Sequence, residues 1–349
     1  MTKILIVAPS WVGDALMSQP LLTLLKQQEP GSAIDVLGPG WALPIYRRMP
    51  EVSGTIESPF AHGELALGKR WRMGRTLRAA NYDRAYVLPN SFKSALLPKF
   101  AGIPLRIGFV GEMRQLLLTD ARALDTRALP LMVERFAFLA SPRGSPIARP
   151  VPRPRLQVDA TERGPLLARL GLTLDARIAC FCPGAEYGPA KRWPASHFAA
   201  LASRLSAAGY SVWVVGSAKE RGIGEEIRVA SADAAVNLCG NTTLDEAVVL
   251  LSCAAVVVSN DSGLMHVAAA LDRPMIALYG SSSPGFTPPL SGHARIVSIG
   301  VPCSPCFQRV CPLGHFDCMM KLDPGLVLAE IQALAETRPF AVRPHPTIQ

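Results

Sequence analysis

The sequence predicts an α/β protein made of two Rossmann-like, doubly wound domains. Short segments rich in valine and isoleucine alternate with segments that have the apolar spacing of helices, and this alternation is typical of a parallel sheet covered by helices. A stretch dense in Pro and Arg interrupts the pattern near the middle of the chain, and the same pattern restarts beyond it. A chain of 349 residues is also too long for a single core. We therefore expect two domains that face a central cleft, where ligands of such folds bind.

The first half of the chain contains three clear strand-like segments. They are KILIVAP at 3–9, AIDVLGP at 33–39 and DRAYVLP at 83–89. Apolar spacing predicts a helix over 18–28, and the residues SFKSALLPKFAG after the third strand also have a helical pattern.

The second half repeats the pattern after the Pro- and Arg-rich segment 141–155, which we interpret as the connection between the domains. Strands are predicted at 177–184, 210–217, 254–259 and 275–280, with helices between them. The expected boundaries are 1–150 for the first domain, 151–158 for the linker, 159–335 for the second domain and 336–349 for a tail.

Composition and charge limit the possible functions. The start, MTKILIVAPSW, does not have the form of a signal peptide, and no apolar run reaches about 18 residues. We therefore expect a cytoplasmic protein with no membrane span. The formal net charge is +9, and residues 61–150 hold 15 Lys or Arg against six Asp or Glu, so the remainder is neutral. Such a region can attract nucleic acid, anionic headgroups or a phosphorylated substrate, or it can serve solubility alone.

The turn after the first strand, PSWVGDALMSQP, places Gly13 and Asp14 just before a helix. A dinucleotide-binding oxidoreductase would have G-x-G-x-x-G at this point, and its absence argues against that class. Asp14 taken alone is consistent with a helix cap.

Two turns of the second domain carry polar residues suited to an anion. CPGAEYGPAKRWP presents Lys191 in a loop broken by Gly and Pro, and SNDSGLMHVAAALDRP follows a buried strand with Asp261, Ser262, Gly263 and His266. Free N–H groups at a helix start and a nearby lysine suit a diphosphate. A simple cap explains Asp261 or Ser262, but it does not explain His266 one turn later.

The ordered motifs PSWVGDALMSQP, LPNSFKSAL, CPGAEYGPAKRWP, GSAKE and SNDSGLMHVAAALDRPMIALYG resemble those of the ADP-heptose:lipopolysaccharide heptosyltransferases, glycosyltransferase family 9, and most closely its heptosyltransferase II branch. The resemblance covers Lys3 to about Leu290. It implies a GT-B fold and an inverting transfer of L-glycero-D-manno-heptose from ADP-heptose to the first heptose of the lipopolysaccharide inner core. The first domain would then bind the acceptor and the second the nucleotide sugar.

The resemblance also implies roles for individual residues. Asp14 would be the catalytic base, and Lys191, Ser262 and the N–H groups near Gly263 would stabilise the departing diphosphate. Glu220 matches the position that holds the ribose and Thr242 the position near the adenine. The full donor-binding set is Ala185, Lys191, Glu220, Thr242, Asp261, Ser262, Gly263 and His266. Enzymes of this kind need no metal for catalysis, because Lys and the helix dipole replace it.

The resemblance implies an acceptor built on Kdo and lipid A, which carries carboxylates and phosphates at the membrane surface, and this would explain the basic charge of the first half. Lys93, Arg106 and Arg114 lie in or after strand-end segments, and we expect them to contact heptosyl-Kdo2-lipid A. The protein is then expected to be peripheral on the cytoplasmic face of the inner membrane. Nucleic acid is not an expected partner.

The segment CSPCFQRVCPLGHFDC departs from the other motifs. Cys303, Cys306, Cys311 and Cys318 have the spacing C-x2-C-x4-C-x6-C, with His315 among them. In a cytosolic chain such a cluster indicates a structural zinc or iron site, with reduced free thiols as the alternative.

Other functions remain open from the sequence. Heptosyltransferase I and a transferase that adds heptose to a protein would use the same fold and donor. A non-catalytic sensor of sugar nucleotides or lipid headgroups would use the same ligands without turnover.

Overall fold

The computed structural model describes residues 1–60 and 63–337, which form two compact units. The first unit is Met1–Gln157 together with Gly285–Thr287, and the second is Val158–Pro284 with the described residues from Pro288 onward. The division after Gln157 falls inside the expected linker 151–158. The short return of 285–287 to the first unit was not expected. Most of the expected tail, 338–349, lies outside the described residues.

A six-stranded, fully parallel sheet forms the centre of the first unit, in the order β3-β2-β1-β4-β5-β6. Its middle strand begins the chain, and the side chains of Ile4, Leu5 and Ile6 are completely buried because helices cover both faces. The strands are β1 (Lys3–Val7), β2 (Ala33–Gly38), β3 (Gly54–Glu57), β4 (Arg84–Val87), β5 (Leu105–Phe109) and β6 (Asp120–Arg122).

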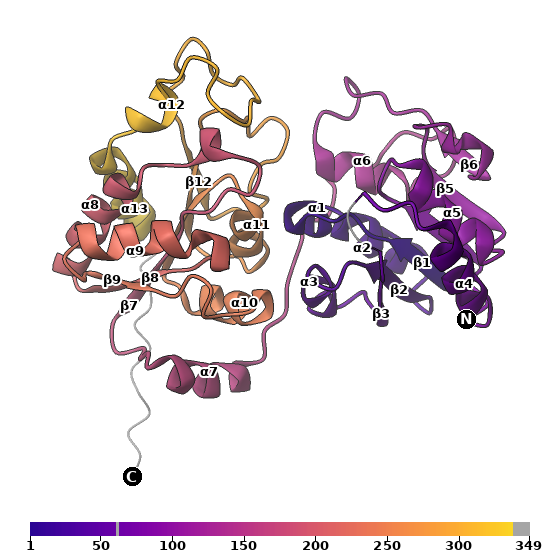
Figure 1. The fold of residues 1–349 in the computed structure, drawn as a ribbon, viewed down its shortest axis with the longest axis horizontal. Coiled ribbons are helices and arrows are strands. Elements are labelled where there is room, and N and C mark those ends of the chain that lie inside the picture. Colours follow the sequence, from indigo (N-terminus) through magenta and orange to yellow (C-terminus); the bar gives the residue numbers. More distant parts are fainter. Residues whose placement is uncertain (61–62, 338–349) are drawn as a thin grey trace. The chain divides into compact units, whose positions relative to one another are not determined.

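The helices of the first unit flank this sheet (Figure 1). Leu77 of α4 and Leu97 of α5 pack into the same apolar cluster as Leu5 and Val87 of the sheet. The helices are α1 (Val12–Met17), α2 (Gln19–Gln28), α3 (Leu43–Arg47), α4 (Leu67–Arg78), α5 (Phe92–Phe100), the 3-10 turn η1 (Arg114–Leu116) and α6 (Met132–Phe138).

The second unit repeats the architecture with the strand order β12-β11-β10-β7-β8-β9, again fully parallel. Strand β10, with the sequence VVVSN, is buried along its whole length, as its valine-rich sequence predicts. The strands are β7 (Arg177–Cys182), β8 (Tyr210–Val214), β9 (Ala235–Asn237), β10 (Val256–Asn260), β11 (Met275–Leu278) and β12 (Ala294–Val297).

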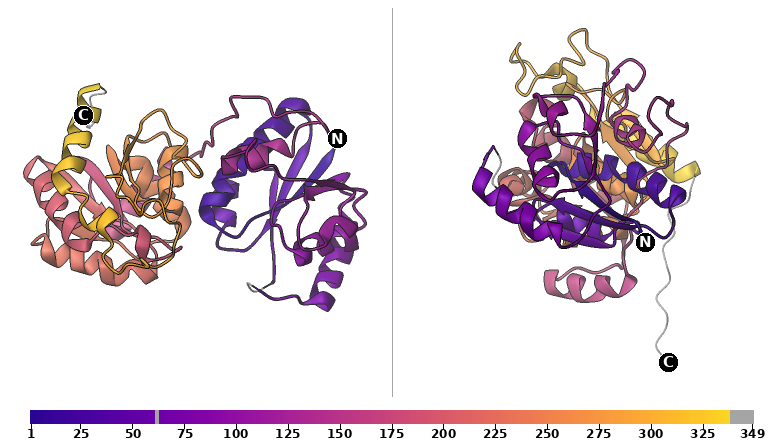
Figure 2. Two further views of the ribbon diagram at one scale, coloured as in Figure 1. Left: turned by 90° about the horizontal axis from the view of Figure 1, so that it is seen from above. Right: turned by 90° about the vertical axis from the view of Figure 1, so that its right-hand side faces the viewer.

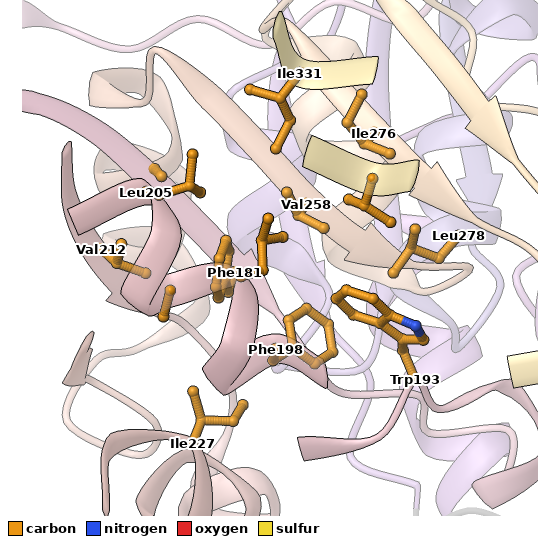
Figure 3. Packing of buried hydrophobic residues seen from close by; sticks show 14 of the residues in the cluster. Phe181, Trp193, Phe198, Leu205, Val212, Ile227, Val258, Ile276, Leu278 and Ile331 are labelled. Atoms are coloured by element: carbon orange, nitrogen blue, oxygen red, sulfur yellow. The ribbon is translucent and has the colours of Figure 1, made fainter. Parts of the chain in front are cut away.

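Helices α8, α9 and α13 lie on one side of the second sheet, and α10 and α11 lie on the other (Figures 1 and 2). On the first of these sides Phe181, Trp193 and Phe198 pack together in the core, and Figure 3 shows their rings beside Val258 and Leu278. The helical elements are η2 (Ala160–Glu162), α7 (Arg163–Leu170), η3 (Pro189–Lys191), α8 (Ala195–Ala207), η4 (Ala218–Glu220), α9 (Arg221–Ala230), α10 (Leu244–Cys253), α11 (Gly263–Ala270), α12 (Asp317–Met320) and α13 (Pro324–Thr337).

The sequence-based elements are confirmed where apolar periodicity was strong, and the two parallel, doubly wound sheets confirm the expected α/β architecture. Strands β3, β5, β6, β9 and β12 were not predicted. All except β5 are only three or four residues long and carry few buried side chains. Among the described residues, no helix has the length and apolar content needed to cross a membrane.

Arg114 holds together the strand ends of the first unit. Its side chain is completely buried, and its guanidinium donates hydrogen bonds to the carbonyl oxygens of Val87, Pro89 and Phe109 and to the side chain of Asn90. These groups follow or end β4 and β5. The guanidinium therefore satisfies carbonyls that would otherwise be buried without partners.

Replacing Arg114 with methionine is expected to lower the free energy of unfolding by about 3 kcal/mol or more, because several buried carbonyls lose their donor. Urea unfolding followed by circular dichroism measures this change. Arg143→Met is the matched control, because the Arg143 side chain is 75% exposed and should change stability by less than about 0.5 kcal/mol. Equal stability of the two variants would contradict the structural role of Arg114.

Candidate functional site

The predicted donor-binding residues follow four strands that are neighbours in the second sheet. Thr242 follows β9, Glu220 follows β8, Ala185 and Lys191 follow β7, and Asp261 follows β10. Because all strands are parallel, their carboxyl ends share one edge, so these residues form a row in the order β9, β8, β7, β10. The strand order reverses between β7 and β10, and this is the place where open α/β sheets bind ligands.

Lys191 and Asp261 form an ion pair at this reversal point. The Lys191 Nζ lies 2.5 Å from Asp261 Oδ2, and the side chains are 17% and 5% exposed. The ammonium group also lies 5.1 Å from the centre of the Tyr187 ring. A buried carboxylate thus fixes the direction of the lysine, whose side chain keeps a small exposed fraction.

His266 and Tyr279 lie in the electrostatic field of the same pair. Burial lowers the pKa of His266 to about 4, with Asp261 opposing the shift and Lys191 adding to it. His266 is therefore neutral at pH 7 and suits a hydroxyl better than a phosphate. Burial, with a smaller contribution from Asp261, raises the pKa of Tyr279. Tyr279 follows β11, and it was not among the residues predicted from the sequence.

The start of α11 leaves donors free for a ligand. Ser262 is the N-cap residue by its backbone, but its side chain makes no capping hydrogen bond and instead lies 3.3 Å from the hydroxyl of Ser259. Asp261 is committed to Lys191. The simpler alternative, in which the side chain of Asp261 or Ser262 caps the helix, is therefore wrong. The first N–H groups of α11, near Gly263, receive no capping side chain, which is the arrangement of an anion site.

Glu220 occupies the next position along the row. Its Oε2 accepts hydrogen bonds from the backbone N–H of Ser217 at 2.8 Å and from the hydroxyl of Ser217 at 2.5 Å, which forms a capping box. A Cβ at Gly184 would lie 3.0 Å from the Glu220 carboxyl carbon. Gly184 therefore allows the carboxylate to lie beside the end of β7, with Oε1 not used by the capping box.

Three hydroxyl groups near this edge lack partners. The side-chain oxygens of Thr242, Ser281 and Ser282 are buried and form no hydrogen bond in the described part of the chain. Buried polar atoms are normally paired, so unpaired ones at strand ends are candidates for ligand contacts. Thr242 was predicted on this edge. Ser281 and Ser282 were missed, and the run SSS directly after strand 275–280 was the available signal.

Asn260 and Trp193 connect the two central turns. The Asn260 amide donates to the carbonyl of Pro183 at 2.8 Å, and its Oδ1 accepts from the backbone N–H of Trp193 at 3.1 Å. Both residues are completely buried. They hold the loop that carries Lys191 against the turn that carries Asp261. Sequence reasoning missed Asn260, because a lone Asn next to an Asp reads as an ordinary turn residue.

Asp14 lies in the first unit, in the first turn of α1. The N-cap of this helix is Trp11, and the Asp14 carboxylate has no hydrogen-bond or ion-pair partner within the residues that the structure describes. Burial raises its pKa to about 6. A cap would be hydrogen-bonded and its pKa lowered, so the capping alternative for Asp14 is wrong. A partly buried carboxylate with a pKa near neutrality suits a general base.

The predicted acceptor residues divide into two groups. Arg106 is buried at the start of β5, and its guanidinium donates to the carbonyls of Leu117 and Ile103 at 2.6 and 2.5 Å. Arg114 is fully enclosed by its own carbonyl partners. The prediction that these two arginines contact the acceptor is wrong, because both side chains are buried and donate to backbone carbonyls of their own unit. Lys93, in the first turn of α5, is half-buried and remains a predicted acceptor contact.

The cysteine-rich segment lies against the Lys191 loop. Cys303, Cys306, Cys311, His315 and Cys318 line one small cavity together with Ser281 and Ala190. Arg309, within the segment, accepts a hydrogen bond from the backbone N–H of Ala190 at 3.1 Å. A Cβ at Gly188 would lie 2.3 Å from the Arg309 carbonyl oxygen, so only glycine allows this contact. The segment therefore braces the loop that presents Lys191.

All eight cysteines of the chain are free thiols. Backbone N–H groups of residues 313–316 lower the pKa of Cys311, which favours its thiolate. The described residues contain no group of three His, Cys, Asp or Glu side chains with the arrangement needed to hold a metal ion. The structural zinc or iron site at the four cysteines stays a prediction, and no chemistry below depends on it.

Comparison with known proteins identifies the family of this chain. The profile of glycosyltransferase family 9 (heptosyltransferase) matches residues 70–317. Lipopolysaccharide heptosyltransferase 2 of Salmonella typhimurium is 48% identical over 95% of this chain and 98% of its own length. Lipopolysaccharide heptosyltransferase 1 of Pseudomonas aeruginosa is 27% identical over 95% and 98%.

Among solved structures, the ADP-heptose lipopolysaccharide heptosyltransferase II of E. coli superposes with a TM-score of 0.87 at 45% identity, covering 96% of this chain and 99% of that chain. This match and the two parallel six-stranded sheets confirm the GT-B fold that the motifs predicted. The chain therefore belongs to glycosyltransferase family 9, the heptosyltransferases, and it is a glycosyltransferase.

Proposed function

We propose that this protein transfers L-glycero-D-manno-heptose from ADP-heptose to the first heptose of the lipopolysaccharide inner core, as a heptosyltransferase II. The observation that carries the proposal is the Lys191–Asp261 pair at the strand reversal, within a row of residues suited to the parts of a nucleotide sugar. The greater identity to a heptosyltransferase 2 than to a heptosyltransferase 1, 48% against 27%, favours this acceptor.

The strand order suggests how the donor lies on the second unit. The adenine would lie near Thr242 after β9 and the ribose near Glu220 after β8. The diphosphate would then reach the β7–β10 reversal, where Lys191, Ser262 and the N–H groups near Gly263 provide positive charge and donors. Neutral His266, with Asp261, would contact heptose hydroxyls.

The reaction follows from the chemistry of these groups. Asp14 accepts the proton of the acceptor hydroxyl while that oxygen bonds to the anomeric carbon of heptose, from the face opposite the leaving group. The bond from that carbon to the diphosphate oxygen breaks, and ADP leaves with the bonding electrons. Negative charge grows on the diphosphate, and the Lys191 ammonium group stabilises it. We propose that this charge replaces a catalytic metal ion, so that no cofactor is required.

We also propose that the protein works in the cytoplasm as a peripheral protein of the inner membrane. The acceptor is a lipid, and the basic residues 61–150 favour an anionic surface.

A direct assay tests the function. The purified protein is incubated with ADP-heptose and either heptosyl-Kdo2-lipid A or Kdo2-lipid A without heptose, and products are identified by mass spectrometry. We expect transfer to the heptosylated acceptor only. Transfer to Kdo2-lipid A would indicate a heptosyltransferase I, and transfer to neither, with ADP-heptose bound, would indicate a sensor or a protein-directed transferase.

Asp14→Asn is expected to lower kcat by about 10²–10⁴-fold, because the base is lost while the shape is retained. The affinity for ADP, measured by calorimetry, should change less than about twofold, since the donor residues belong to the other unit. A kcat within a few-fold of the unsubstituted enzyme would exclude Asp14 as the base.

The pH dependence should report the raised pKa of Asp14. Because the base must be deprotonated, kcat/KM should fall as pH decreases through about 6. Stability should have the opposite trend: the folded state binds this proton more tightly than the unfolded state, so stability is lost as pH rises from about 4 to 6. Thermal unfolding should therefore show Asp14→Asn to be more stable than the unsubstituted protein at pH 8, with the difference disappearing near pH 4.

Lys191→Ala is expected to weaken ADP binding by about 10–100-fold and to lower kcat as well, because the ammonium group acts in both ground and transition states. The double variant Lys191→Ala/Asp261→Asn removes the orphaned carboxylate and should show the same loss of ADP affinity. Lys219→Ala is the control, since the Lys219 side chain is 72% exposed and pairs with Glu186. ADP affinity unchanged in both Lys191 variants would remove this residue from the diphosphate site.

A further inference from the structure

Helix α4 and the residue before its N-cap expose large apolar side chains. Leu65, Leu67 and Trp71 are 48%, 50% and 49% exposed. Leu67 and Trp71 are four residues apart and therefore lie on the same side of the helix. Three large apolar side chains close together on a surface are a feature of interaction sites more than of an ordinary soluble face.

The packing of α4 fixes which side faces outward. Its buried residues are Arg70, Gly74 and Leu77, which form one stripe. A Cβ at Gly74 would lie 2.5 Å from the Cβ of Phe100, so α4 packs closely against α5. Arg70 is held inward by the carbonyls of Leu65 and Glu64 at 2.7 and 3.1 Å. The close contact of Gly74 with Phe100 fixes which side of α4 faces α5, and Trp71 lies outside the buried stripe.

The rest of the helix surface is cationic. Lys69, Arg72, Arg75 and Arg78 are exposed, and the twelve residues of α4 include no Asp or Glu. The nearby Glu64 pairs with Lys69 at 3.0 Å. The Arg75 guanidinium lies 5.0 Å from the centre of the Trp71 ring. Cations and an aromatic ring thus share one surface, which we name the α4 face: Leu65, Leu67, Lys69, Trp71, Arg72, Arg75 and Arg78.

We infer that the α4 face binds the surface of an anionic lipid bilayer. Tryptophan and leucine partition to the boundary between headgroups and acyl chains, and neighbouring Lys and Arg side chains contact lipid phosphates. A helix of twelve residues is too short to cross the bilayer and would lie in its plane. A nucleic acid would match the charge but would leave Leu65 and Leu67 without a partner.

This inference deepens the proposed function, on which it rests for the lipid nature of the acceptor. Seated by the α4 face, the first unit would remain at the membrane surface between turnovers. The enzyme would then meet its lipid acceptor by diffusion in two dimensions. Vesicle binding tests this contact without any turnover, so the failure of one proposal can be told from the failure of the other.

The test is sedimentation of the full-length protein with vesicles of phosphatidylcholine alone or with about 30% phosphatidylglycerol. Binding is expected only to the anionic vesicles, and it should weaken as salt reduces the Debye length from about 10 Å to about 3 Å. Arg72→Glu/Arg75→Glu should lower the partition coefficient about tenfold or more. Leu67→Ala/Trp71→Ala should also lower it, and this loss should persist at high salt because it is apolar.

The matched control is Arg143→Glu/Arg153→Glu, which makes the same change in net charge at two exposed arginines outside α4. It should bind vesicles as the unsubstituted protein does. Equal binding to both vesicle types, an equal loss in the control, or no effect of Leu67→Ala/Trp71→Ala would each overturn the inference. Preference for a single-stranded oligonucleotide over anionic vesicles would reassign the face to nucleic acid.

Turnover provides the last comparison. Both α4 variants should retain kcat with a soluble, delipidated acceptor, and they should lose activity on acceptor embedded in anionic vesicles. Equal activity of the unsubstituted protein and the variants on the embedded acceptor would overturn the inference. Absence of turnover in the unsubstituted protein, with vesicle binding intact, would overturn the proposed function and leave the membrane contact supported.

Discussion

The buried ion pair between Lys191 and Asp261 is the interaction on which the carboxyl-end edge of the second sheet depends. The pair joins the loop after β7 to the start of α11, at the reversal of strand order. Its burial makes it costly to break, because either charge left alone would be desolvated without a partner. Asn260 joins the same two segments through hydrogen bonds to Pro183 and Trp193. The close contact of Gly188 with Arg309 also holds the Lys191 loop against the cysteine-rich segment. Under the proposed function, a lysine held by these contacts would meet the diphosphate with little reorganisation.

The two units use buried charge in different ways. In the second unit, the Asp261 carboxylate pairs with the Lys191 ammonium group and fixes its direction. In the first unit, Asp14 is partly buried and has no hydrogen-bond or ion-pair partner among the residues described, and burial raises its pKa to about 6, which lowers stability at neutral pH. Such a cost is common where a group must act as a base. Arg114 shows the third case, in which a buried cation serves the fold alone, because backbone carbonyls use its donors.

The charge excess of residues 61–150 also separates into distinct uses. Arg106 and Arg114 are structural, whereas the cations of α4 are exposed beside Trp71 and Leu67. A net charge computed over a region cannot distinguish these cases. What differs is the local surroundings of each guanidinium, which decide whether its donors meet the protein or the solvent.

The sequence by itself determined the α/β class, the two sheets, the carboxyl-end turns and the family, because strand burial and long motifs are local properties of the chain. It also placed Asp14, Lys191 and Asp261 in turns suited to chemistry. Only the tertiary structure decided that Arg106 and Arg114 are internal, that Asp14 is not a cap, and that Asn260, Tyr279, Ser281 and Ser282 belong to the edge with Lys191. These outcomes depend on burial and on contacts between segments far apart in the chain, such as the 70 residues that separate Lys191 from Asp261. Local patterns carry no information on such contacts, because they arise only when the strands take their order in the sheet.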